Sequence, residues 1–99
     1  MKEEVEVNDT FLYDIFRMSQ NARNLWDALR NLRAVATTAK ERWKGIVNYE
    51  PQMKREVDMY KEKVKDAYRD FNVSYFTISG KSIDIYIDEQ TKEWMSNEV

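Results

Sequence analysis

Apolar residues recur at alternating spacings of four and three along most of the first half of the chain. The pattern resumes after a break between residues 46 and 53 and continues to residue 71. The two apolar stripes are Phe11, Ile15, Met18, Ala22, Leu25, Leu29, Leu32, Ala36, Ala39, Trp43 and Ile46, then Met53, Val57, Tyr60, Val64, Ala67 and Phe71. A stripe sustained over several heptads is typical of a long helix with a narrow buried face. The sequence therefore predicts an antiparallel hairpin of one long and one shorter helix.

Residues at the ends of these stripes fit helix termini. Asn8 is suited to cap the first helix, with Val7 and Leu12 placed for a hydrophobic contact across its first turn. Gly45 fits the end of that helix, because glycine readily adopts the left-handed backbone conformation found there. Pro51 fits the first turn of the second helix, where a missing backbone N–H removes no hydrogen bond.

The pattern changes to alternation further along the chain. Val73–Ile78 and Ile83–Asp88 are predicted to be two strands, with Gly80-Lys81 as a two-residue turn between them. In this register Tyr75 lies opposite Tyr86 on one face, and apolar residues pair with apolar residues on the other. The segment is therefore predicted to be a β-hairpin.

Two further elements complete the prediction. Glu3–Val7 alternates charge and valine, which suits a short edge strand. Asp88 is placed to cap a short last helix over Glu89–Asn97, with Trp94 and Met95 on its buried side. We therefore expect a single α+β domain over residues 1–99, in which the helical hairpin packs against a small antiparallel sheet and a short C-terminal helix.

The two predicted helices differ in length, which leaves part of the longer one without a helical partner. In a tight antiparallel hairpin, Phe71 reaches only to about Ala28. Beyond that point the apolar face widens to include Leu12, Phe16 and Trp26. A broad face suits a sheet, so we expect the sheet to cover it. Alternatively, a second copy of the chain covers this face, in a homodimer formed through the long helix.

Composition removes most catalytic chemistry. The chain has 99 residues, of which 42% are hydrophobic, with no cysteine and no histidine. Disulfides, thiolate nucleophiles, Cys/His zinc sites and a side chain that ordinarily titrates near neutral pH are therefore excluded. Two carboxylate pairs, Asp84 with Asp88 and Glu89 with Glu93, lack an accompanying glycine-rich loop or lysine relay and are interpreted as surface charge. We expect no enzymatic activity, no metal and no cofactor.

Two other sequence features favour structural interpretations. Ser79-Gly80-Lys81-Ser82 ends like a phosphate-binding loop, but Tyr75 stands where that motif needs a glycine, and a strand is expected to follow. The hairpin turn is the better interpretation. The N-terminus has no signal-peptide pattern and no apolar run approaches about 18 residues, so we expect neither a signal peptide nor a membrane span.

Charge is unevenly distributed. Residues 1–16 hold five acids and one base, whereas residues 17–44 hold seven bases and two acids. A basic flank combines side chains of both predicted helices, namely Arg23, Arg30, Arg33, Lys40, Lys44, Lys54 and Lys61. Such a flank, if open, binds the phosphates of DNA or RNA. We favour the other interpretation, in which the flank is solvated or is neutralised by Asp84, Asp88 and Glu93, because the net charge is −2.

The predicted pair of Tyr75 and Tyr86 is a second candidate contact face. If exposed, two aromatic rings would stack on bases or on a partner's side chains. The favoured interpretation is that they pack beneath the helix that carries Trp94.

The chain resembles the small orphan proteins of filamentous double-stranded DNA viruses that infect hyperthermophilic, acid-loving archaea (the lipothrixvirus and rudivirus group). The likeness is carried by the length, the absence of cysteine and histidine, and the run Asn21-Ala22-Arg23-Asn24-Leu25-Trp26-Asp27. The resemblance implies a small, heat- and acid-stable α+β protein without catalytic residues, located in the infected host cell or the virion. The few glycines and prolines and the many charged residues also favour a hot habitat.

Taken together, these features predict a non-enzymatic viral protein of unassigned role that acts as a structural or protein-interaction module. The alternative is a nucleic-acid-binding module that uses the basic flank. The partner protein is not encoded in any motif of the chain.

Overall fold

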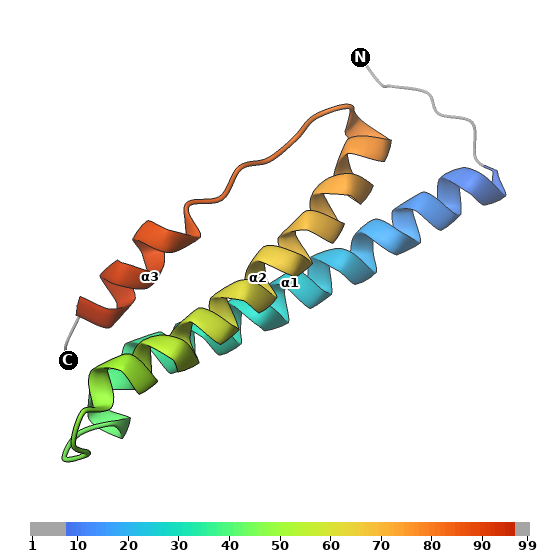
Figure 1. Ribbon diagram of the computed structural model, residues 1–99. Coiled ribbons are helices and arrows are strands. Elements are labelled where there is room, and N and C mark those ends of the chain that lie inside the picture. The colour runs from blue at the N-terminus through green and yellow to red at the C-terminus, as the bar shows by residue number, and fades with distance from the viewer. Residues whose placement is uncertain (1–7, 97–99) are drawn as a thin grey trace.

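The computed structural model describes residues 8–96, which form three α-helices joined by two connections. Helix α1 spans Asp9–Arg42, α2 spans Tyr49–Ser79 and α3 spans Ile87–Ser96. Helices α1 and α2 pack along one another as an antiparallel hairpin, and α3 runs back beside them toward the turn that joins them (Figure 1). The predicted helical hairpin is therefore confirmed, although its two arms are nearly equal in length.

The predicted helix ends are close to those observed. The Oδ1 atom of Asn8 accepts a hydrogen bond from the Phe11 N–H at 2.9 Å, which confirms the N-cap. Helix α1 ends at Arg42, and Gly45 follows in the turn with a φ of +84°. Pro51 lies in the first turn of α2, as expected. Val7, the other half of the predicted hydrophobic contact, and the strand Glu3–Val7 lie outside the described residues.

The α+β fold class, which both the residue pattern and the resemblance led us to expect, is wrong. Residues 8–96 contain three helices and no strand. Helix α2 continues through Val73–Ile78 and ends at Ser79, with Gly80 as its C-cap at a φ of +72°. The Gly80 N–H donates to the Phe76 carbonyl at 2.8 Å. Gly80-Lys81 is therefore a helix stop rather than a hairpin turn.

Packing against α1 explains why residues 73–79 are helical. Phe71, Ser74 and Ile78 continue the three- and four-residue spacing of the buried stripe, with Ser74 buried. The Ser74 hydroxyl donates to the Phe71 carbonyl at 2.8 Å, and the Asn21 side chain of α1 donates to the Ser74 hydroxyl at 3.3 Å. These contacts outweigh the preference of valine, tyrosine and threonine for strands, which is weak and depends on context.

The second predicted strand, Ile83–Asp88, is also wrong. Residues 81–86 form an irregular connection, and α3 begins at Ile87, two residues before the predicted start. The connection is held by side chains of α2: the Ile83 N–H donates to the Asn72 Oδ1 atom at 2.9 Å, and the Tyr68 hydroxyl donates to the Ile83 carbonyl. Because Asp88 is the second residue of α3, it is not the predicted N-cap.

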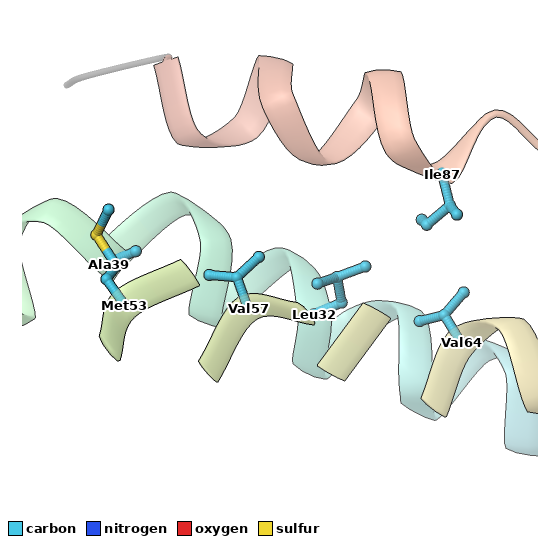
Figure 2. Packing of buried hydrophobic residues seen from close by; sticks show 6 residues of the cluster. All are labelled: Leu32, Ala39, Met53, Val57, Val64 and Ile87. Atoms are coloured by element: carbon cyan, nitrogen blue, oxygen red, sulfur yellow. The ribbon is translucent and has the colours of Figure 1, made fainter. Parts of the chain in front are cut away.

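The buried core lies in the half of the molecule nearest the turn. Its hydrophobic members are Leu32, Ala36, Ala39, Met53, Val57, Val64 and Ile87. Figure 2 shows Ile87 of α3 pointing toward the hairpin, where Leu32 of α1 and Val64 of α2 lie. Trp94 and Met95 are half-buried against the same cluster, in agreement with the prediction that they lie on the buried side of the last helix.

The half of the hairpin farther from the turn is more open. The two helices diverge in that direction (Figure 1), and no described residue before Leu32 is fully buried. The predicted sheet that was to cover the N-terminal half of α1 does not exist within residues 8–96. Leu12, Phe16 and Trp26 are each more than half exposed. Within the described part of the chain, this face of α1 is therefore not covered by a sheet.

Candidate interaction surface on the first helix

A second row of residues runs along α1 beside the buried stripe. Each member follows a stripe residue directly and therefore lies about 100° further around the helix. We call this the outer row, and it consists of Leu12, Phe16, Ser19, Arg23, Trp26, Arg30 and Arg33. All seven residues are exposed. The outer row therefore presents both apolar and cationic side chains to solvent.

The apolar members of the outer row are large. Leu12 is 52% exposed, Phe16 is 55% exposed and Trp26 is 58% exposed. The Arg30 guanidinium lies 4.8 Å from the centroid of the Trp26 ring, which is cation–π geometry. Phenylalanine, tryptophan and arginine are enriched in protein–protein interfaces, where each offers a large contact area and tryptophan and arginine also donate hydrogen bonds.

The basic side chains predicted as phosphate contacts fall into two groups. Arg23, Arg30 and Arg33 belong to the outer row, and the last two line one surface hollow together with Thr37. The Thr37 hydroxyl donates to the Arg33 carbonyl at 2.8 Å, so it is already engaged by the backbone. The others lie elsewhere: Lys40 and Lys44 are exposed near the end of α1, Lys54 is exposed near the start of α2, and Lys61 lies farther along α2.

Lys61 is neutralised by α3. Its Nζ atom lies 3.0 Å from the Asp88 carboxylate and 3.5 Å from the Asp58 carboxylate, and its side chain is 21% exposed. Burial opposes the charge of Lys61, but the carboxylates of Asp88 and Asp58 outweigh burial and raise its pKa. The hydrogen bond from Lys61, helped by the charge of Lys65, lowers the pKa of Asp88. Asp88, one of the three acids expected to neutralise the basic flank, therefore does so at Lys61, and it also pairs with Lys65, which lies outside the flank.

The predicted face of Tyr75 and Tyr86 is not formed as a cross-strand pair, because the strands do not exist. Tyr75 is a half-buried residue of α2 whose ring is stacked on Phe71 with 5.9 Å between centroids. Tyr86 is exposed at the end of the irregular connection. The structure therefore places one tyrosine in helix packing and the other in solvent.

The described residues offer little for small-molecule chemistry. A hollow of about 100 Å³ lies between α1 and α2 and is lined by Asp14, Arg17, Asn21, Asp70, Val73, Ser74 and Thr77. Its central polar groups, Asn21 and Ser74, are hydrogen-bonded to each other and to the Asp70 carbonyl. Among residues 8–96, no group of three His, Cys, Asp or Glu side chains is arranged to hold a metal ion. In the same part of the chain, none of the helices has the length and apolar character needed to cross a membrane.

The outer row was partly visible in the sequence. Leu12, Phe16 and Trp26 were recognised as a widening of the apolar face, and the arginines as part of a basic flank. The prediction missed that these residues form one row, because the expected sheet was assigned to the apolar members. Comparison with protein-family models, curated proteins and solved structures found no match. The functional proposal therefore rests on the surface itself.

Proposed function

We propose that this chain is a non-enzymatic structural or protein-interaction module that binds another protein, or a second copy of itself, through the outer row of α1. The supporting observation is the exposure of Leu12, Phe16 and Trp26 on one side of one helix. Large apolar side chains gathered on an exposed surface are typical of protein contact sites. The rigid helix beneath them holds their spacing and so lowers the entropy lost on binding.

The resemblance to proteins of filamentous archaeal viruses suggests where the module acts. In that setting the module acts in the infected cell or in the virion, at high temperature and low pH. The composition, with 34% charged residues and no cysteine, supports a heat-stable chain. Measurement of thermal unfolding at acidic pH tests this part of the proposal, and a midpoint below about 65 °C, within the mesophilic range, would contradict it.

Nucleic-acid binding is the second candidate function. The observation in its favour is the exposure of three arginines, Arg23, Arg30 and Arg33, on the same side of α1. Against it, Lys61 and Lys65 are paired with Asp88, and the net charge of the chain is −2. Modules that bind nucleic acids ordinarily present a strongly basic surface. We therefore favour a protein partner.

The proposal is tested by affinity capture from the natural host with three forms of the chain. Wild-type protein is compared with Phe16→Asp and with Met59→Asp, because Met59 is an exposed apolar residue of α2 outside the outer row. We expect one partner to be retained by wild-type protein and by Met59→Asp but lost with Phe16→Asp. Capture that is equal for all three forms would remove the outer row as the binding surface.

A further inference from the structure

We infer that the outer row pairs with the outer row of a second copy of this chain, in antiparallel orientation, about a twofold axis near Ser19. This inference rests on the proposed function, because it uses the same surface, and it adds the identity and geometry of the partner.

The order of residues makes the row complementary to itself when it is reversed. With Ser19 facing Ser19 of the second copy, facing residues have numbers that add to about 38. Leu12 then faces Trp26 of the second copy, and Phe16 faces Arg23. An apolar side chain therefore meets an apolar side chain, and an aromatic ring meets a guanidinium, which is a favourable cation–π partner.

Charge selects the antiparallel orientation. Asp9, in the first turn of α1, faces Arg30 of the second copy in this register, and Arg30 is exposed. Within α1, residues 9–16 carry two acids and no base, whereas residues 17–42 carry six bases and two acids. Antiparallel pairing brings each acidic segment of α1 against a basic one, while parallel pairing would bring like charges together. Symmetric dimers require one surface patch that is complementary to itself, and the outer row has this property.

The size of the row indicates a modest affinity. Residues 9–30 of a helix span about 32 Å with a width of about 10 Å. This footprint is small compared with the ~800 Å² that each partner buries in a standard interface. We therefore expect a dimer that forms at high micromolar concentration and weakens as salt screens the Asp9–Arg30 pairs.

Cysteine cross-linking tests the axis directly, because the natural chain has no cysteine. Ser19→Cys places two thiols across the twofold axis, and mild oxidation should convert most of the protein to a disulfide-linked dimer. Gln20→Cys is the matched control, because Gln20 is also exposed but is turned about 100° away from the row. Equal cross-linking of the two variants would overturn the inference.

Charge exchange tests the register. Asp9→Arg and Arg30→Asp, measured singly by sedimentation equilibrium, should each weaken dimerisation about fivefold. The double variant should recover the wild-type dissociation constant, since each altered residue again faces an opposite charge. Single variants that dimerise as well as wild type, or a double variant that stays weak, would contradict this register.

The mass of the wild-type protein separates this inference from the proposed function. A species of twice 11.9 kDa that is lost with Trp26→Asp, which sets a carboxylate against Leu12 of the second copy, supports both. A monomer at about 1 mM, together with a captured partner that depends on Phe16, refutes the second copy and leaves the interaction module in place. A dimer that survives Trp26→Asp refutes the outer row as the dimer surface. Circular dichroism of every variant verifies that the helices are retained.

Discussion

The carboxylate of Asp88, at the start of α3, lies 3.0 Å from the ammonium group of Lys61 in the middle of α2. The neighbouring Ile87 is buried against the hairpin core (Figure 2). One apolar and one ionic contact therefore hold the start of α3 against the hairpin. The same ion pair removes one lysine from the basic flank. The ion pair thus links the docking of the last helix to the amount of positive charge that α2 presents.

Ile87 should be the main anchor of α3. Ile87→Ala is expected to lower the free energy of unfolding by about 2–4 kcal/mol, because it removes a buried side chain and leaves a cavity. Hydrogen exchange should show faster exchange of amides 87–96 while the amides of α1 and α2 near the turn stay protected. Ile83→Ala is the control, since Ile83 is exposed in the connection. Equal effects of the two substitutions would contradict this role.

Leu32 should dominate the stability of the hairpin. Its side chain is 0% exposed, so Leu32→Ala is expected to lower the free energy of unfolding by about 3 kcal/mol. Leu12→Ala removes the same atoms from a side chain that is 52% exposed, and we expect a change of about 0.5 kcal/mol or less. Urea titration at low protein concentration measures both without a contribution from association. A larger loss of stability from Leu12→Ala than from Leu32→Ala would contradict the location of the core in the half of the hairpin nearest the turn.

Glu56 should make stability depend on pH in the acidic range. The Arg42 guanidinium lies 2.6 Å from its carboxylate, and this hydrogen bond lowers the pKa of Glu56. A carboxyl whose pKa is lowered by folding stabilises the protein above its ordinary pKa of about 4.3, and that contribution is lost as the pH falls through the folded value. Glu56→Gln is therefore expected to lower stability by about 0.5 kcal/mol at pH 7 and by progressively less below about pH 4.

A matched carboxylate identifies the source of that pH dependence. Glu62 is exposed and lies 3.9 Å from Lys65, so Glu62→Gln should change stability little at any pH. Chemical unfolding at a series of pH values between 2 and 7 provides the comparison. If the loss caused by Glu56→Gln persists undiminished at pH 2, the contact with Arg42 is not its source.

Binding of duplex DNA should be weak and should respond to Asp88. We expect a mobility shift only at low salt and high protein concentration, because Lys61 and Lys65 are already paired with Asp88. Asp88→Asn leaves Lys61 with Asp58 and Lys65 with Glu62, but removes one carboxylate from each lysine, and should therefore strengthen the shift. Arg30→Glu with Arg33→Glu should abolish it. Tight binding that is insensitive to salt and unchanged by these substitutions would contradict this expectation.

The helical hairpin was predictable because its signals are local or periodic. The four-three spacing places Leu32 and Val64 on inward faces whatever the surroundings, and both are 0% exposed. Asn8 and Pro51 act through backbone groups within their own turn of helix, so their roles follow from sequence position alone. Leu12, Phe16 and Trp26 were recognised as a widening of the apolar face, but the sheet expected to cover them is wrong, and all three are more than half exposed.

Residues 73–88 were decided by tertiary structure. Their alternation of apolar and polar residues suits a strand, yet α2 continues to Ser79 and the connection after it is irregular. Hydrogen bonds from Asn21 to Ser74 and from Ile83 to Asn72, made between segments distant in sequence, support this arrangement. The accessibility of Lys61 was likewise undetermined by its position in α2, because it depends on where α3 docks. Local periodicity determines the conformation of a segment when the tertiary contacts of that segment favour the same conformation. When a short segment has two conformations of similar free energy, long-range contacts determine which conformation it adopts.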